Sequence, residues 1–390
     1  MSHREPSGPM DIAVMFDAPE ENWRSMDLAG EMLLDQWRST PSFNVKATRV
    51  SIHIPSIVRR VSGPWRGGFN ADRALTRYVG YPLRALAARR PGRLFHVVDH
   101  SYAQLVHALP NARTGVYCHD LDAFWPALLP GRAGRFAYRR ALAHVLLRGL
   151  RAAAVVFHST REVGRALADG GLVPRSRLVL APYGVAPEFN AQPDPQECAD
   201  AVLKPLEGRP YILHVGSAVS RKRLDVLFEV FARLRADHPD LRLVQQGAAL
   251  SPAQRAHIDR LGIGDALVQP EKLERTALAG LYRRASAVLL TSEAEGFGFP
   301  VIEAMACGAA VVASDLPALR EVGGNAALYA PVGDVPAWTA RVHALLEDAS
   351  AGPPKAARLE RARAFTWREH ARTLRDAYEN LVTARTPLAS

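Results

Sequence analysis

Residues 287–315, in the second half of the chain, carry two carboxylates on either side of a glycine-bearing turn. The segment opens with an apolar run typical of a buried strand, and Pro300 suits the first position of a helix that we expect to end at Gly308. Glu295 precedes the turn, and Glu303 follows eight positions later, in the first turn of that expected helix. Backbone N–H groups of such a turn bind anions, and carboxylates accept hydrogen bonds from paired hydroxyls such as a ribose diol. Structural roles, in the helix dipole and in capping the loop, explain the two carboxylates equally well.

A second candidate site follows the first predicted strand of the same half. That strand ends near Gly216, and Ser217 comes next. The short loop after them carries Arg221 and Lys222, and an amphipathic helix begins directly afterwards. Cations beside a helix N-terminus form a diphosphate site, because charge-assisted hydrogen bonds and the helix dipole act on the same oxygens. A solvated basic run is the alternative interpretation.

The first half offers His119, which closes a predicted strand. In a doubly wound sheet, the carboxyl end of a strand lies at the ligand-binding edge. A purely structural histidine is the alternative. Asp120 and Asp122 follow, and two aspartates separated by one residue also occur in metal sites, although such pairs are common by chance.

Residues 287–315 resemble the donor-site signature of the retaining nucleotide-sugar glycosyltransferases of family 4, the glycosyl transferases group 1. In that family a Glu, seven residues and a second Glu enclose a glycine-Phe-glycine turn, and Glu295 and Glu303 match that spacing. The resemblance implies that Glu303 binds the donor ribose and that Glu295, with the turn backbone, contacts the transferred sugar. The turn consists of Gly296, Phe297 and Gly298.

The resemblance extends to the other candidates. Lys222 matches a family lysine, whereas Ser217 stands where an arginine is usual, so Arg221 would supply the missing charge. The catalytic residues implied are His119, Glu295, Arg221 and Lys222. The donor-binding residues implied are Gly216, Ser217, Arg221, Lys222, Gly296, Phe297, Gly298 and Glu303. In this family cations and a helix terminus bind the diphosphate, so we expect no metal ligand at Asp120 or Asp122 and no cofactor besides the nucleotide sugar.

The resemblance covers residues 113–332, including a strand-Ser-helix element at residues 155–167 and a turn at residues 177–189. It is weakest over the first 100 residues. The first strand-to-helix loop usually carries paired glycines in this family. Here that loop contains Glu21, Asn22, Trp23 and Arg24.

Strand-like runs alternate with helical patterns throughout, which predicts an α/β protein with doubly wound sheets. With the resemblance, this implies the GT-B fold, in which two facing Rossmann-like domains enclose a cleft. We expect an N-terminal acceptor domain over residues 1–190, a proline-rich linker over 191–209, a donor domain over 210–366 and a final helix within 367–390 that packs back on the first domain. The predicted strands are residues 11–16, 45–52, 94–99, 115–118, 153–158, 178–181, 211–215, 241–246, 266–268, 287–291, 310–314 and 327–329.

The composition excludes several protein classes. With 48% hydrophobic and 23% charged residues, the 390-residue chain is globular and not disordered, collagenous or a coiled coil. Charged residues interrupt the apolar stretches, so none reaches the about 20 residues needed to cross a bilayer. The polar start of the sequence is unlike a signal peptide. Three widely spaced cysteines suit neither disulfides nor zinc, so we expect buried thiols in a reducing cytoplasm. They are Cys118, Cys198 and Cys307.

The net charge of +10 is concentrated in one window, because residues 51–150 contain 15 basic and 4 acidic side chains. Such a field attracts nucleic acid, anionic lipid headgroups or phosphorylated substrates. An arginine-rich composition with solvated side chains explains the charge equally well. Residues 132–151 form a predicted helix with an apolar face and an arginine-rich flank, which suits a membrane interface or a core-packing helix.

These observations predict a retaining, metal-independent hexosyltransferase that moves mannose or a glucose-type sugar from a nucleoside diphosphate sugar to an acceptor hydroxyl, in glycan, polysaccharide or glycolipid synthesis. The acceptor is a glycan, a lipid-linked sugar or a small molecule. We expect a cytoplasmic protein, peripheral at the inner face of the membrane if the basic window binds anionic lipid. The sequence leaves the donor sugar, nucleobase, acceptor, linkage and oligomeric state open.

Three alternatives were compared with this prediction. A GT-B phosphorylase or nucleotide-sugar epimerase shares the fold, but the spacing of Glu295 and Glu303 fits transferases better. A nucleic-acid-binding protein would explain the charge, yet no zinc finger, basic zipper or aromatic ribonucleoprotein motif accompanies it. A non-catalytic relative would bind the nucleotide sugar without transfer, and the presence of His119 and Lys222 beside these carboxylates favours an enzyme.

Overall fold

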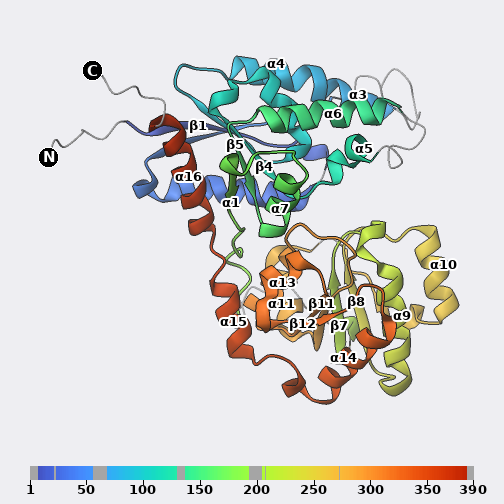
Figure 1. The fold of residues 1–390 in the computed structure, drawn as a ribbon. Coiled ribbons are helices and arrows are strands. Elements are labelled where there is room, and N and C mark those ends of the chain that lie inside the picture. Colours follow the sequence, from blue (N-terminus) through green and yellow to red (C-terminus); the bar gives the residue numbers. More distant parts are fainter. Residues whose placement is uncertain are drawn as a thin grey trace. The chain divides into compact units, whose positions relative to one another are not determined.

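The computed structural model describes residues 8–21, 23–55, 68–129, 137–192, 204–206, 208–271 and 273–383. The chain divides into two compact units, one formed by Met1–Gly184 with Trp367–Ser390 and the other by Val185–Thr366. Each unit contains a six-stranded sheet with helices around it (Figure 1). All twelve predicted strands are present, so the α/β prediction is confirmed.

The sheet of the first unit is parallel, with strand order β2-β1-β3-β4-β5-β6. Its central strands are buried on both faces, which explains their short, continuous apolar sequences. The order reverses between β1 and β3, so these two strands flank the switch point at which ligands of such sheets bind. The strands are β1 (Met10–Met15), β2 (Val45–Val50), β3 (Leu94–Val97), β4 (Thr114–Cys118), β5 (Val155–His158) and β6 (Leu178–Leu180).

Helices cover this sheet. The 3-10 segment η4 (His100–Ala108) packs closely on α6 (Ala137–Ala152), because Gly149 has no side chain: a Cβ there would lie 2.0 Å from the carbonyl oxygen of Ala103. A π-helical turn, η3 (Thr76–Gly80), joins two short helices into one run. The remaining helices are α1 (Arg24–Ser39), α3 (Gly68–Leu75), α4 (Tyr81–Ala87), α5 (Trp125–Leu128) and α7 (Arg161–Asp169).

The second unit has a parallel sheet of order β12-β11-β10-β7-β8-β9. Here the order reverses between β10 and β7. The loops that follow these two strands therefore begin at the switch point of the sheet. The strands are β7 (Tyr211–Val215), β8 (Arg242–Gln246), β9 (Leu267–Val268), β10 (Ala287–Leu290), β11 (Val311–Ser314) and β12 (Leu328–Ala330).

The helices of the second unit follow from clear sequence signals. In α10 (Pro252–Leu261), Ser251 and Gln254 form a reciprocal capping box. In α9 (Leu224–Asp237), half of the residues are buried apolar side chains that pack on the core. The other helices are α11 (Arg275–Arg284), α12 (Phe299–Ala306), α13 (Pro317–Gly323), α14 (Val335–Glu347) and α15 (Lys355–Arg363).

The last helix, α16 (Trp367–Thr383), belongs to the first unit. Its Tyr378 hydroxyl donates to the carbonyl of Phe95 at 3.1 Å, and Trp37 of α1 donates to the carbonyl of Ala371 at 3.0 Å. The boundary between the units falls after Gly184, six residues before residue 190, where we expect the first domain to end. The backbone N–H of Val185 already bonds to Phe365 of the second unit, and most of the expected linker, residues 193–203, lies outside the described residues.

None of the described helices is both long and apolar enough to cross a membrane. Cys118 and Cys307 are buried, as expected. The third cysteine, Cys198, lies outside the described residues.

Candidate functional site

The loops after β7 and β10 meet through a buried ion pair. The ammonium of Lys222 contacts Oε1 of Glu295, and the Ser292 hydroxyl donates to the same oxygen at 2.7 Å. The Glu295 side chain is only 7% exposed and that of Lys222 12%. Both side chains are therefore mostly buried, and their contact with a bound donor stays a prediction. The third member, Arg221, lies 3.6 Å from Oε2 of Glu295.

Hydrogen bonds to backbone carbonyls fix the two loops relative to one another. The N–H of Glu293 donates to the carbonyl of Arg221 at 2.8 Å, and the Thr291 hydroxyl donates to the carbonyl of Lys222 at 2.9 Å. The guanidinium of Arg221 donates to the carbonyl of Ala294 at 3.1 Å. These bonds fix the positions of the charged side chains before any ligand arrives, which is the condition for electrostatic preorganisation.

The charges determine the protonation of the site. Burial raises the pKa of Glu295, but the positive charges of Lys222 and Arg221 outweigh it and hold the pKa below its usual range. His214, at the end of β7, is also buried, and burial together with the Lys222 charge lowers its pKa to about 3. The site therefore contains an ionised Glu295 and a neutral His214 at neutral pH. No sequence pattern indicates His214 as part of the site, because only the fold shows that it lies against Gly216.

The basic loop has the geometry predicted for it. Gly216 follows β7, Ser217 is exposed, and α9 begins at Leu224 directly after the cations. Arg223, the residue before the helix, has φ of 48° and pairs with Asp225 at 2.8 Å. Positive charge thus stands beside a helix N-terminus, an arrangement that binds phosphate oxygens.

The turn after Glu295 requires its last glycine. Gly298 has φ of 91°, and a Cβ there would lie 2.5 Å from the Leu319 side chain. Phe297 is buried, with its ring against Phe299 and Phe365 at centroid distances of 5.4 and 5.8 Å. Its side chain anchors the turn, so only the backbone of Gly296, Phe297 and Gly298 is suited to contact a ligand.

Glu303 lies in the second turn of α12, not in the first as predicted, because the helix begins at Phe299 with Pro300 in its second position. Its carboxyl accepts a hydrogen bond from the Tyr282 hydroxyl at 3.0 Å. Burial raises the pKa of Glu303 to about 7. The pKa values of the two carboxylates are thus shifted in opposite directions. The cations keep Glu295 ionised, whereas Glu303 is near its protonation midpoint at neutral pH, and such a division is typical of functional pairs.

A cavity of about 260 Å³ opens near the carboxyl end of β8 in the same unit. The Gln245 amide, at its wall, donates to the carbonyl of Gly216 at 3.2 Å and accepts from Gln269 at 2.7 Å. Sequence reasoning had not singled out these glutamines. The cavity is lined by Gln245, Gly247, Ala248, Ala249, Arg255, Gln269, Pro270 and Glu271.

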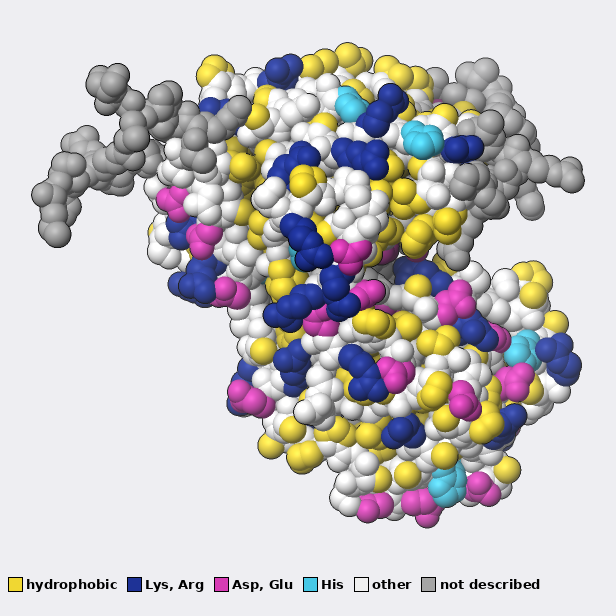
Figure 2. Space-filling model, in the orientation of Figure 1, with side chains coloured by type: hydrophobic (Ala, Val, Ile, Leu, Met, Phe, Trp, Pro, Cys, Tyr) yellow, Lys and Arg dark blue, Asp and Glu magenta, His cyan; other side chains and the backbone are white. Residues whose placement is uncertain are grey.

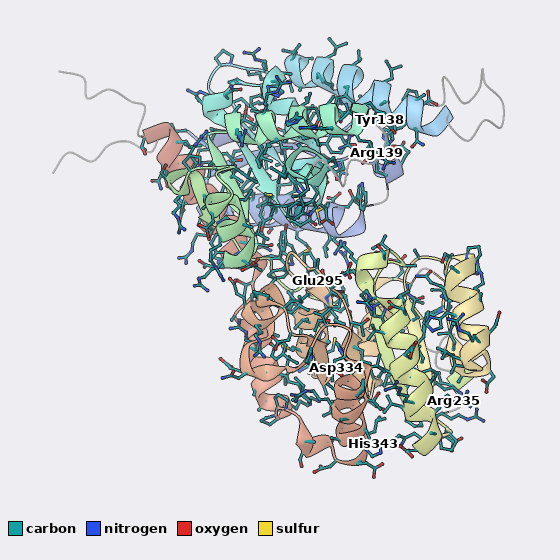
Figure 3. All side chains as sticks on the ribbon, turned by 45° about the vertical axis from the view of Figure 1, so that its right-hand side comes forward. Tyr138, Arg139, Arg235, Glu295, Asp334 and His343 are labelled. Atoms are coloured by element: carbon teal, nitrogen blue, oxygen red, sulfur yellow. The ribbon has the colours of Figure 1, made fainter. Side chains whose placement is uncertain are left out.

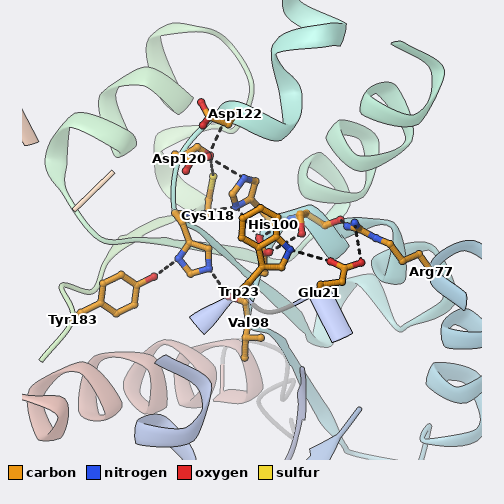
Figure 4. A network of polar contacts seen from close by, with 12 residues as sticks. Glu21, Trp23, Arg77, Val98, His100, Cys118, Asp120, Asp122 and Tyr183 are labelled. Carbon is orange, nitrogen blue, oxygen red and sulfur yellow. Dashed lines mark hydrogen bonds and ion pairs between the residues drawn. The ribbon is translucent and has the colours of Figure 1, made fainter. Parts of the chain in front are cut away.

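In the first unit, both ring nitrogens of His119 have partners within that unit. Nδ1 contacts the Tyr183 hydroxyl, and Nε2 lies 2.8 Å from the carbonyl oxygen of Val98 (Figure 4). Burial lowers the pKa of His119 to about 4. His119 is therefore a neutral, fixed imidazole at the end of β4, and its role toward a sugar stays a prediction.

Asp120 is held by the neighbouring His100. The two side chains approach to 3.4 Å, and Asp120 also accepts the N–H of Asp122 at 2.9 Å. Although burial opposes it, the His100 contact lowers the pKa of Asp120. The oxygen and nitrogen atoms of Asp99, His100 and His119 lie close enough to hold a metal ion, but these histidine nitrogens already have protein partners. The absence of a metal requirement stays a prediction.

Asp17 and Asp99 follow β1 and β3, at the switch point of the first sheet. Asp17 is 2% exposed, and neither carboxyl oxygen has a conventional hydrogen-bond partner. Burial, followed by the nearby Asp99 charge, raises the pKa of Asp17 well above its usual range. No local pattern indicates this pair, because Asp17 and Asp99 are far apart along the chain.

Comparison with protein families shows what the second unit resembles. Residues 196–364, which make up most of that unit, match the model of the family "Glycosyl transferases group 1". The second unit is therefore similar to the glycosyl transferases group 1. The ion pair of Lys222 and Glu295 and the carboxyl of Glu303 all lie within it.

Curated relatives agree with this family. The chain is 29% identical over 227 residues to the O-antigen chain mannosyltransferase B of Escherichia coli, covering 53% of this chain and 56% of that protein. It is 31% identical over 236 residues to the D-inositol 3-phosphate glycosyltransferase of Geodermatophilus obscurus, covering 56% of this chain and 51% of that protein. The chain thus spans about half the length of these relatives.

Solved structures confirm the fold of the whole chain. The Anabaena protein HepE, crystallised with UDP and glucose, matches with a TM-score of 0.69 at 14% identity, over 96% of this chain and 100% of that chain. At this identity the likeness concerns the fold alone. The two sheets of this chain are those of the GT-B fold that the sequence predicts.

Proposed function

We propose that this chain is a retaining glycosyltransferase of family 4 that moves a hexose from a nucleoside diphosphate sugar to an acceptor hydroxyl. The observation that supports it most is the cluster of Lys222, Arg221 and Glu295 at the switch point of the unit that is similar to the glycosyl transferases group 1. Such a cluster combines cations for a departing diphosphate with a carboxylate for the developing positive charge of the sugar.

The proposed chemistry follows from these charges. As the bond between the anomeric carbon and the diphosphate breaks, negative charge grows on the phosphate oxygens, and Arg221, Lys222 and the start of α9 stabilise it. Preorganised groups of this kind commonly contribute several kcal/mol to catalysis. The leaving phosphate accepts the proton of the acceptor hydroxyl, so no further carboxylate is needed as a base. Glu295 stays ionised because of its cations and stabilises the oxocarbenium-like sugar.

Donor binding is proposed to divide among three places. The diphosphate binds the basic loop, with Gly216 and Ser217 beside it. The ribose hydroxyls bind Glu303, and the nucleobase enters the cavity bounded by Gln245 and Gln269. The turn from Gly296 to Gly298 presents its backbone to the transferred sugar, near which His119 is also expected.

Two donor classes fit this proposal. One curated relative is a mannosyltransferase, which favours mannose. A glucose-type sugar on uridine diphosphate is the second class that we propose. The acceptor is proposed to be a glycan, a lipid-linked sugar or a small molecule. The enzyme is proposed to need no metal and to work in the cytoplasm, in contact with an anionic membrane.

A thermal-shift screen tests donor binding. UDP-glucose, UDP-N-acetylglucosamine and GDP-mannose are added in turn, each with and without EDTA. One of them should raise the melting temperature of the wild type but not of Glu303→Gln. The matched control is Arg235→Ala, at the opposite end of α9, where Arg235 pairs with Asp265 at 2.9 Å (Figure 3). This control should respond as the wild type does. No shift with any nucleotide sugar would contradict the proposal.

A further inference from the structure

The run of α3, η3 and α4 leaves a row of large apolar side chains in solvent. Leu75, Val79, Leu83 and Leu86 are 43%, 49%, 61% and 43% exposed. Their spacing of four, four and three residues places them along one side of a helix. Four of the ten large hydrophobic side chains that are exposed among the described residues therefore lie on this one run.

These side chains are not the ones that hold the run to the protein. The core contacts come from Thr76, Tyr81 and Ala85, which are all at most 3% exposed. Tyr81 also donates to the carbonyl of Phe16 at 2.6 Å. The run is thus apolar on two sides, one of them buried and the other in solvent. A contiguous apolar surface that is exposed to solvent typically marks a contact with a protein or a membrane.

The sequence leaves a membrane-facing and a core-packing interpretation open for the helix at residues 132–151, of which 137–151 are described and lie in α6. Its apolar residues Leu146, Leu147 and Leu150 are at most 7% exposed and belong to the hydrophobic core. The core-packing interpretation of that helix is therefore correct. The apolar surface in solvent lies instead on the preceding run, which the sequence analysis had not identified.

Arginines flank the exposed row. Arg84, Arg89 and Arg90 are all exposed on α4 or directly after it. Arg139 and Arg140 are exposed at the start of α6, next to the exposed Tyr138 (Figure 3). Figure 2 shows hydrophobic and Lys or Arg side chains together over the part of the first unit that contains α4 and α6. No acidic residue lies between Arg73 and Arg93.

We propose that this surface, Leu75, Val79, Leu83, Leu86 and the arginines beside them, binds an anionic lipid bilayer. The apolar row enters the boundary between headgroups and acyl chains, while the arginines contact the phosphates. This deepens the membrane contact of the proposed function by assigning it to a surface, and it rests on that contact. A second copy of the chain fits less well, because a symmetric dimer through this surface would bring the arginines of both copies together.

Co-sedimentation of the full chain with vesicles tests the assignment. One vesicle contains phosphatidylglycerol mixed with phosphatidylcholine, and the other phosphatidylcholine alone. The wild type should pellet with the anionic vesicle and dissociate as the salt concentration rises.

Three variants test which side chains bind. The double substitution Leu83→Gln with Leu86→Gln keeps good helix formers at exposed positions and should weaken binding by about tenfold. Arg84→Gln with Arg89→Gln and Arg90→Gln should weaken it by about tenfold or more. The control Val382→Gln, at an exposed apolar residue of α16, should bind like the wild type.

The outcomes separate the surface from the membrane contact itself. Equal binding by the wild type and the Leu83 and Leu86 variant would overturn the assigned surface and leave the membrane contact standing. If the wild type does not bind anionic vesicles, both the assigned surface and the membrane contact are overturned. Light scattering tests the alternative of a dimer. If the wild type is a dimer and the Leu83 and Leu86 substitutions make it monomeric, the surface binds a second copy of the chain and not a membrane. Nucleotide-sugar binding should be unchanged in every variant, so a failure of the donor site would be recognised separately.

Discussion

The ammonium of Lys222 and the carboxylate of Glu295 join two loops that lie 73 positions apart in the sequence, and both side chains are almost completely buried. A buried ion pair contributes little net stability, but removal of one partner leaves an uncompensated charge. The pair therefore links the shape of the site to its charge. A donor diphosphate would compete with Glu295 for the same ammonium.

The first prediction concerns this pair. Lys222→Met should destabilise the second unit by about 3 kcal/mol, because Glu295 stays buried with only the more distant Arg221 near it. Glu295→Gln removes the other charge, and the double variant should be more stable than the sum of the single effects predicts. Chemical denaturation of the four proteins measures this coupling. Strictly additive losses would show that the pair is not coupled.

The second prediction concerns the pH dependence of Glu303. Its pKa of about 7 in the folded protein exceeds the ordinary 4.5, so the folded state retains a proton that the unfolded state loses. The stability from this group is complete below about pH 4.5 and is lost as the pH rises to about 7, by about 3 kcal/mol in all. Glu303→Gln should flatten that part of the profile in thermal unfolding. A variant with the wild-type profile would contradict the raised pKa.

Donor affinity should follow the opposite course. Ribose hydroxyls donate to an ionised carboxylate, so affinity should increase as the pH rises through about 7, where Glu303 ionises. Loss of one charged hydrogen bond costs about 1.5 to 3 kcal/mol, which is the expected effect of Glu303→Gln on donor binding at high pH. Calorimetric titrations at several pH values measure this. A pH-independent affinity that the variant shares would remove Glu303 from the ribose site.

Asp17 provides a prediction for the first unit. Because its pKa is raised by burial and by Asp99, its ionisation opposes folding as the pH rises above the ordinary value of 3.8. Asp17→Asn keeps the shape, adds donors toward Asp99 and should stabilise the protein at neutral pH by about 1 to 3 kcal/mol. The control is Asp35→Asn, an exposed carboxylate on α1, which should change little. Destabilisation by Asp17→Asn would show that an ionised Asp17 is needed for the fold.

Metal independence is tested by EDTA. The cations of the basic loop should bind the diphosphate without a divalent ion, so turnover should survive chelation, and Asp122→Ala should not change this. Loss of turnover in EDTA with rescue by magnesium or manganese would contradict the prediction. The aspartates after β4 would then need to be reconsidered as ligands.

Local patterns predicted the strands well, since a parallel strand is a short apolar run. The donor motif is contiguous in sequence and could be found there, and its role in binding stays a prediction. The predicted start of α12 was wrong by one residue, which moves Glu303 into the second turn, because proline fits more than one position of a first turn and marks a helix start only approximately. The sequence pattern did not indicate the exposed apolar surface of the run from α3 to α4, because the apolar residues of this run face two sides and form no single stripe. Contacts such as Asp17 with Asp99, or His119 with Tyr183, depend on strand order, which no local pattern contains.

The central claim is tested most directly by the stereochemistry of sugar release. Each α-linked nucleoside diphosphate hexose is incubated with the enzyme, water serves as the acceptor, and NMR identifies the anomer of the first hexose released. The account predicts release of the α anomer, faster than by the Lys222→Met or Glu295→Gln variant and at the wild-type rate by Arg235→Ala. Release of the β anomer, or release that these two site variants leave unchanged, would contradict it.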